Sequence, residues 1–145
     1  MQTFLPHPSF AQSAACLDNR RLGKQRVETL QILNALTVPS KGWKNHPATK
    51  MWSQSIPLLV CYGLAMCEEW RHKRGFQDTC ADKIARFFDL YTFDECRAAP
   101  RPAWLGDPDF HRSHQSNLVR KMPSHYRQYF PDVPDDLPYI WPSAL

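Results

Sequence analysis

The chain has 145 residues, of which 43% are hydrophobic and 22% charged; this is enough for one domain with one core, and it excludes a disordered chain. The formal net charge of +4 and the pI of about 8.9 permit a polyanionic partner without requiring one. The five cysteines contain no Cys-x-x-Cys pair, which argues against a zinc ribbon and favours free buried thiols in a reducing compartment.

Helical spacing recurs along the chain and strand-like alternation is weak, so we expect an all-α protein. The N-terminal residues lack a basic region followed by a long apolar run, the pattern of a signal peptide. The first helical region is expected from residues 8–12 to about Leu36, with a break near Asp18, and Pro39 and Gly42 end it. Its apolar side is formed by leucines at helical spacing: Leu22, Leu30, Leu33 and Leu36.

A second helical region opens at residues 45–47, where a proline suits the first turn, and Pro57 restarts or kinks it. Residues 58–65 are apolar nearly all round, which predicts the central and most buried helix. The region ends at Gly75, after basic residues that favour a helix C-terminus. Because the apolar run is too short to span a bilayer, we expect a cytoplasmic protein without membrane contact.

The remaining sequence predicts shorter helices over residues 79–90, 110–121 and 123–129, separated by loops that contain proline and glycine. From Pro131 onward the chain is rich in proline, and we expect an extended arm that packs back on the body. The predicted architecture for residues 1–145 is a compact, single-domain helical bundle with irregular loops and an extended C-terminal tail.

The first charged constellation lies on the first long helix. At 100° per residue, Glu28 shares a face with Lys24 and Arg21, and Arg20 lies nearby. Nearby positive charges keep a carboxylate ionised, which suits a catalytic role. The alternative interpretation is a solvated helix face on which Glu28 pairs with Lys24, an interaction worth only about 0.2–0.5 kcal/mol.

Arg26 belongs to the same basic stretch but falls among the leucines of the apolar side. A long basic side chain on an apolar stripe usually extends its charge to solvent or forms an ion pair. The alternative interpretation places Arg26 at the edge of a binding cleft.

The second constellation, residues 110–131, contains no acidic residue. Its basic side chains are Arg112, Arg120, Lys121 and Arg127, together with His111, His114 and His125. Interleaved with them are Ser113, Ser116, Asn117, Tyr126 and Tyr129. Basic side chains neutralise phosphates, and aromatic rings stack on nucleobases, so the pattern favours nucleic-acid contact. The alternative is a basic helix face packed against the acidic tail residues Asp132, Asp135 and Asp136.

Three histidines could in principle bind a metal ion. His111 and His114 are spaced i, i+3, and His46 lies elsewhere in the sequence. The sequence offers no well-placed carboxylate or thiol beside them, so we expect no metal site.

In this order, the motifs resemble the pyrimidine dimer DNA glycosylase family, its cellular members more closely than its phage members. Residues 26–30, which follow a short N-terminal segment, look like the family's helix with an essential glutamate. Residues 44–47 and 73–76 look like the start and end of the family's central helical region. Residues 111–118 and 125–130 look like its C-terminal helix and its DNA-contact segment.

The resemblance implies a chemistry in which the N-terminal amine attacks the sugar carbon that bears a damaged base. Because Gln2 is bulky, we expect Met1 to be retained and its amine to be the nucleophile. An α-amino group, with a pKa of about 7.7–8.0, is a readier nucleophile than lysine at about 10.4. Glu28 would stabilise positive charge on the sugar and move protons. The resulting imine leads to strand cleavage, so a glycosylase with AP lyase activity is expected, without metal or cofactor.

The implied partner is double-stranded DNA that contains a pyrimidine dimer or another damaged or modified base, with no obligate protein partner. The residues expected to contact DNA are Arg20, Arg21, Lys24, Arg26, Lys44, His46, Arg112, His114, Arg120, Lys121, Tyr126, Arg127 and Tyr129. Two other hypotheses stay open: a non-catalytic DNA-binding module of the same fold, and a protein-interaction domain whose basic face pairs with its own acidic tail.

Overall fold

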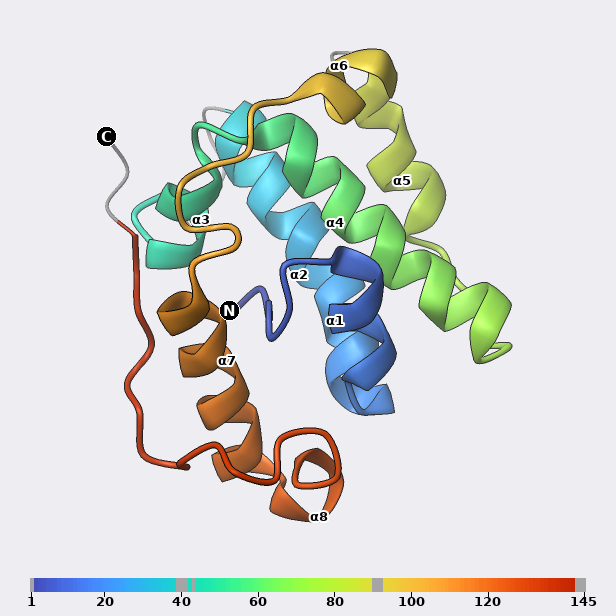
Figure 1. The fold of residues 1–145 in the computed structure, drawn as a ribbon. Helices are drawn as coiled ribbons and strands as arrows, with labels where there is room; N and C mark the ends of the chain where they lie inside the picture. The colour runs from blue at the N-terminus through green and yellow to red at the C-terminus, as the bar shows by residue number, and fades with distance from the viewer. Residues whose placement is uncertain (1, 39–41, 43, 90–92, 143–145) are drawn as a thin grey trace.

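The computed structural model describes residues 2–38, 42, 44–89 and 93–142 of the chain (Figure 1). Its helices are α1 (Phe10–Cys16), α2 (Asn19–Thr37), α3 (Pro47–Trp52), α4 (Ile56–Glu68), the π-helical η1 (Glu69–Lys73), α5 (Ala81–Ala85), the 3-10 helix η2 (Arg86–Asp89), α6 (Phe93–Ala98), α7 (Pro108–Lys121) and α8 (Pro123–Tyr126). The described residues contain no strand, so the predicted all-α helical bundle is confirmed.

Side-chain caps explain where the helices begin. Asp18 separates α1 from α2 and accepts a hydrogen bond from the backbone N–H of Arg21, so the predicted break near this residue is confirmed. Ser9 caps α1 in the same way. The imidazole of His46 caps α3, in which Pro47 occupies the first turn as predicted.

Helix α4 is the central helix, as its apolar sequence predicts. It packs against α1, α2 and α5 (Figure 1). A Cβ atom added to Gly63 would lie 2.5 Å from Cγ2 of Thr29, so glycine permits the close approach of α4 to α2. The π-helical turn η1 continues α4, and Gly75 follows with a φ of +73°, a left-handed conformation that favours glycine.

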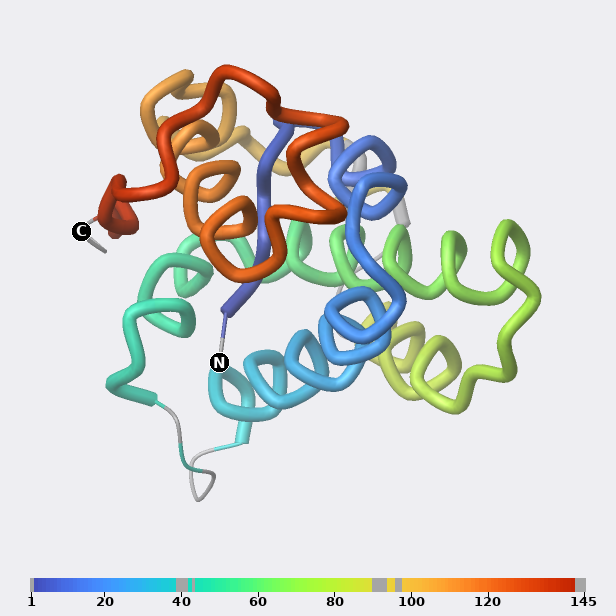
Figure 2. The backbone as a smooth tube through the Cα atoms, turned by 90° about the horizontal axis from the view of Figure 1, so that it is seen from below, coloured from blue at the N-terminus to red at the C-terminus, as the bar shows by residue number. Residues whose placement is uncertain are grey.

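The N-terminal segment, residues 2–6, runs between α7 on one side and α2 and α4 on the other (Figures 1 and 2). After α8 the chain continues as an extended arm along α7, which confirms the predicted tail for residues 131–142. The hydroxyls of Ser116 and Ser113 accept hydrogen bonds from the backbone N–H groups of Leu137 and Ile140, at 3.0 and 3.2 Å.

The structure departs from the predicted elements in its shorter helices. Helix α6 was not predicted, because six residues cannot display a repeating apolar pattern. The helix predicted over residues 79–90 is divided into α5 and η2, and α8 ends at Tyr126 rather than at Tyr129. Pro39, the predicted end of α2, and Leu90 lie outside the described residues. No helix in the described part of the chain is long and apolar enough to cross a membrane.

Candidate active site at the N-terminal segment

Two histidines of α7 hold the N-terminal segment by its backbone. Residues 2–6 are all buried, although chain ends usually fray. The Leu5 N–H donates to Nδ1 of His114 at 2.9 Å. Nε2 of His111 accepts from the Gly106 N–H, so its Nδ1–H donates to the Leu5 carbonyl at 2.7 Å. Burial lowers the pKa of His111 and lowers that of His114 to about 3, so both rings are neutral at neutral pH.

Gln25 holds the same segment from the side of α2. Its Oε1 accepts from the Phe4 N–H at 2.9 Å and lies 2.5 Å from the Tyr62 hydroxyl. Its Nε2 donates to the Gln2 carbonyl at 2.8 Å and to Oε2 of Glu28 at 3.1 Å. One buried side chain therefore contacts both the N-terminal backbone and the carboxylate.

Glu28 receives a second hydrogen bond directly from the N-terminal segment. The Gln2 N–H donates to Oε2 of Glu28 at 3.2 Å. The segment is further anchored at Thr3, whose hydroxyl accepts from the indole of Trp52 at 3.0 Å. Glu28 forms no ion pair with any described residue. The pair with Lys24 that the alternative interpretation expected is therefore not formed.

A cavity of about 330 Å³ opens beside this carboxylate. It is lined by Gln2, Phe4, Arg20, Arg21, Lys24, Gln25, Glu28 and Lys121. Three of its cationic side chains come from α2, as the helical spacing predicts, and Lys121 comes from the end of α7. The structure thus joins the first basic constellation to one residue of the second, around a single acidic side chain.

Comparison with known proteins places the chain in a family. The family model described as pyrimidine dimer DNA glycosylase matches residues 1–84, more than half of the chain. The chain belongs to the pyrimidine dimer DNA glycosylase family. No curated protein matches it, and no solved structure does. Family membership supports DNA glycosylase activity, and DNA as the substrate, in general terms. The matched residues contain the N-terminal segment, Gln25 and Glu28, whereas α7, α8 and the arm lie outside the match.

Three of the residues predicted to contact DNA have side chains that are buried or paired within the protein. His114 and Tyr126 are fully buried, so neither can touch DNA in this conformation, and this part of the prediction is corrected. Tyr126 instead hydrogen-bonds to the carboxylate of Asp18. Arg26 pairs with Asp78, and its guanidinium lies 4.4 Å from the centre of the Trp70 ring. Arg26 is therefore a paired residue rather than part of the cavity beside Glu28.

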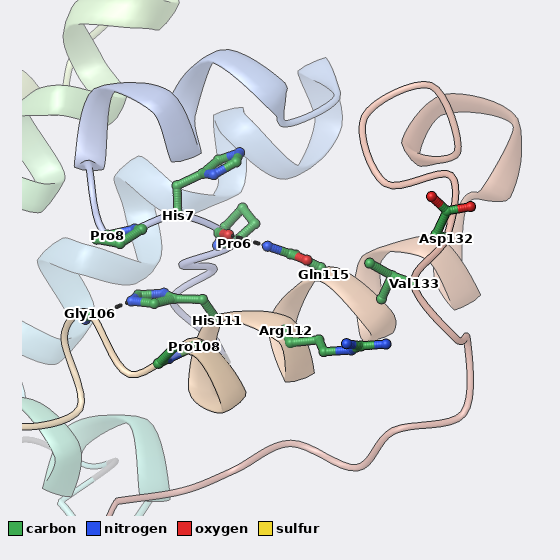
Figure 3. Close-up of a pocket in the computed structure, with 10 residues that line it drawn as sticks. All are labelled: Pro6, His7, Pro8, Gly106, Pro108, His111, Arg112, Gln115, Asp132 and Val133. Atoms are coloured by element: carbon green, nitrogen blue, oxygen red, sulfur yellow. Dashed lines mark hydrogen bonds between the residues drawn. The ribbon is translucent and has the colours of Figure 1, made fainter.

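Other basic side chains of the second constellation contact the arm. Arg127 donates to the Val133 carbonyl at 2.6 Å, and Arg120 donates to the Asp135 carbonyl at 3.3 Å. Both bonds go to backbone oxygens, whereas the alternative interpretation expected the acidic side chains of the tail. Arg112 lies apart from Glu28, in a separate cavity of about 470 Å³ between α7 and residues 6–8 (Figure 3).

The last three predicted contacts lie at other places. Lys44 lines a cavity with the end of α2. The His46 ring packs edge-on against Trp141, with 6.3 Å between ring centres. Burial lowers the pKa of His46, while the negative charge of Glu28 acts in the opposite direction. Tyr129 is 44% exposed and packs against the His125 ring. The described residues contain no group of three side chains suited to a metal ion.

The sequence analysis missed the buried polar residues that hold the N-terminal segment beside Glu28. Gln25 and Tyr62 are both buried, and neither residue type by itself indicates a function. The available signal was position: Gln25 lies on the stripe formed by Leu22, Thr29 and Leu33, at helical spacing. A polar side chain on a buried stripe must find hydrogen-bond partners, and here the partners are the first residues of the chain.

Proposed function

We propose that this chain is a DNA glycosylase with AP lyase activity, in which the Met1 amine is the nucleophile and Glu28 is the catalytic carboxylate. The contact between the Gln2 N–H and Glu28, at 3.2 Å, carries the proposal. Three covalent bonds join the Met1 nitrogen to the Gln2 nitrogen and span at most about 4 Å. The amine is then within roughly 7 Å of the carboxylate, a range that includes direct and water-mediated proton transfer.

The proposed reaction begins when the amine attacks C1′ of the damaged nucleotide. The bond from C1′ to the base breaks, and the base leaves with the electron pair and gains a proton. Ionised Glu28 stabilises the positive charge that develops on the sugar and accepts the proton released by the amine. Glu28 passes that proton to O4′ as the sugar ring opens, which gives a protonated imine between the protein nitrogen and C1′. The carboxylate then accepts a C2′ proton, and the electron pair of that C–H bond expels the 3′ phosphate.

The cationic side chains around the cavity suit a polyanionic substrate. Arg20, Lys24 and Lys121 line it together with Arg21, which is also paired with Asp18 at 3.1 Å. We propose that these four cationic side chains bind the phosphates that flank the damaged nucleotide. A lesion weakens stacking and pairing, so its nucleotide is easier to extrude toward the cavity than an undamaged one.

Borohydride trapping tests the nucleophile. Untagged protein that begins at Met1 is incubated with duplex DNA containing either a cyclobutane pyrimidine dimer or an abasic site, and the imine is reduced in place. We expect a covalent adduct that mass spectrometry assigns to the N-terminal residue. Salt-sensitive DNA binding without any adduct would indicate the non-catalytic DNA-binding module, and an adduct on a lysine would overturn the role of Met1.

Glu28→Gln tests the carboxylate. The amide oxygen can still accept from the Gln2 N–H, so the fold and DNA binding should be retained while the negative charge is lost. We expect base release in a single turnover to fall by about 10²–10⁴-fold, with DNA affinity little changed. The control is Glu68→Gln, which removes an exposed carboxylate from α4 and should leave the rate unchanged. Equal loss of binding and cleavage in Glu28→Gln would point to a structural role.

A further inference from the structure

We infer that Gln25 is a positioning residue that sets the spacing between the N-terminal amine and Glu28. The inference rests on the proposed function, because it assigns a role within the same amine–carboxylate site. Gln25 touches no reacting atom in this assignment; it acts through the two groups that do.

The hydrogen bonds of Gln25 join two parts of the site that no helix connects. Its Oε1 accepts from the Phe4 N–H, and its Nε2 donates to the Gln2 carbonyl, so the carboxamide follows the backbone of residues 2–4. The same Nε2 donates to Oε2 of Glu28, which also accepts from the Gln2 N–H. Movement of the carboxamide would therefore displace the N-terminal backbone and the carboxylate together.

The surroundings make this arrangement rigid. Gln25 is 1% exposed, and Tyr62 on α4 is fully buried with its hydroxyl 2.5 Å from Oε1. The single phenol proton is shared between Oε1 and the Phe4 carbonyl, which lies 2.8 Å from the hydroxyl oxygen. Burial raises the pKa of Tyr62 well above its usual value, so the phenol stays neutral and acts as a donor. Every polar atom of the Gln25 carboxamide is thus used, and a rotated amide would oppose like groups.

A carboxamide is required because its oxygen must accept hydrogen bonds while its nitrogen donates them. One end accepts two hydrogen bonds and the other donates two. A protonated glutamic acid can imitate three of these four hydrogen bonds, since it keeps an accepting oxygen and offers one O–H donor in place of two N–H donors. An ionised glutamate cannot, because its second oxygen would face Oε2 of Glu28 at about the 3.1 Å now spanned by the hydrogen bond.

Gln25→Glu therefore converts the positioning role into a pH dependence. Two carboxylates so close share one proton, and that proton leaves only at a pH above the usual range of a carboxyl group. The singly protonated pair keeps the hydrogen bond between the two side chains but leaves the Gln2 carbonyl without its donor, and the doubly ionised pair repels. The titratable and charged groups around the pair are Tyr62 from α4, His46 at the N-cap of α3, Arg20, Arg21 and Lys24 from α2, and Lys121 from α7.

The experiment measures strand cleavage of an abasic-site duplex under single-turnover conditions from roughly pH 5 to pH 9. We expect the rate of Gln25→Glu relative to wild type to be highest at the acid end. Above the pH at which the pair loses its shared proton, the relative rate should fall about tenfold per pH unit. Gln25→Met, which can make none of the four hydrogen bonds, should be slow at every pH.

Gln31→Glu is the matched control. Gln31 lies three residues after Glu28, as Gln25 lies three before it, but it is exposed. The substitution adds the same charge at the same sequence separation without touching residues 2–4, so its relative rate should not vary with pH. Circular dichroism at each pH reports folding.

The inference would be overturned by a relative rate for Gln25→Glu that is independent of pH, or by a Gln25→Glu protein that is unfolded even at the acid end. Wild-type activity with Gln25→Met would do the same. The proposed function fails in a different way, because wild-type protein itself would then form no borohydride-trapped adduct with the abasic duplex.

Discussion

At the scale of single residues, the N-terminal segment depends on side chains that satisfy its backbone. Gln25 bonds to Phe4 and Gln2, while His111 and His114 bond to both backbone groups of Leu5. An unsatisfied buried backbone group costs about 1–3 kcal/mol, so these contacts are what keep a chain end inside the molecule. They also make the segment sensitive to the protonation of the residues that hold it.

His114 predicts how stability depends on pH. The unfolded chain protonates this residue near its ordinary value of 6.5, whereas burial lowers the pKa in the folded protein to about 3. The unfolded state therefore binds the proton first as pH falls, and the free energy of unfolding should decrease by up to about 1.4 kcal/mol per pH unit below 6.5. Denaturant titrations between roughly pH 6.5 and 4.5 measure this slope.

His114→Asn provides the comparison for that slope. The Asn oxygen can accept from the Leu5 N–H, as Nδ1 of His114 does now, but the amide does not titrate. The variant should show a shallower decline of stability in acid. An equal slope in both proteins would show that other groups cause the decline, among them His111 and His7, whose pKa values burial also lowers.

At the scale of elements, the approach of α2 to α4 brings Gln25 and Tyr62 together. Thr29 and Gly63 face each other across this contact, one on each helix. The Thr29 hydroxyl donates back to the Gln25 carbonyl at 2.7 Å, so the bond stays within α2 and only the methyl group faces α4. The spacing of the two helices is therefore set by one missing side chain and one methyl group.

Gly63→Ala should separate the helices. The added Cβ would lie 2.5 Å from the Thr29 methyl, and we expect a loss of about 1–3 kcal/mol in the free energy of unfolding. Thr29→Ser removes that methyl while keeping the hydroxyl, so the double variant should recover part of the loss; the added Cβ would still lie 3.1 Å from Cδ1 of Ile84. Gly42→Ala is the control, since a Cβ there meets nothing within 4 Å. Additive losses in the double variant would contradict this explanation.

At the scale of the whole molecule, the cavity beside Glu28 is assembled from distant parts of the chain. The N-terminal segment and α2 belong to the family match at residues 1–84, whereas Lys121 belongs to α7 beyond it. The arm then closes over α7 and brings Trp141 against His46. The C-terminal part thus supplies both a wall of the cavity and the histidines that hold Leu5.

Salt dependence of DNA binding tests whether Lys121 joins the cations of α2 in one phosphate-binding surface. The four cationic side chains of the cavity predict a slope of log K against log salt of roughly −3.6, about −0.9 for each phosphate contact. Lys121→Gln should reduce the slope by about 0.9. Lys83→Gln, on α5 and across α4 from α7 (Figure 1), should leave it unchanged. Equal effects of the two variants would exclude a specific contribution from Lys121.

The sequence by itself determined the helical content, the break at Asp18, the buried α4 and the face that unites Glu28 with Lys24 and Arg21. These features depend on periodicity and on capping residues close together in the chain, so local rules are sufficient. The family resemblance came from the same local motifs. Helix α6 escaped prediction because one and a half turns carry too little periodic signal.

Only the tertiary structure decided which polar residues face inward and which meet. Arg26 and Arg127 look like equivalent basic residues in the sequence. In the structure, Arg26 pairs with Asp78, whereas Arg127 donates to the backbone of the arm. Gln25 gave no chemical signal, because its partners lie 21 and 23 residues away, on a segment with no regular structure. Hydrogen bonds between distant segments depend on how helices pack, and helix packing is a property of the whole chain rather than of any stretch of it.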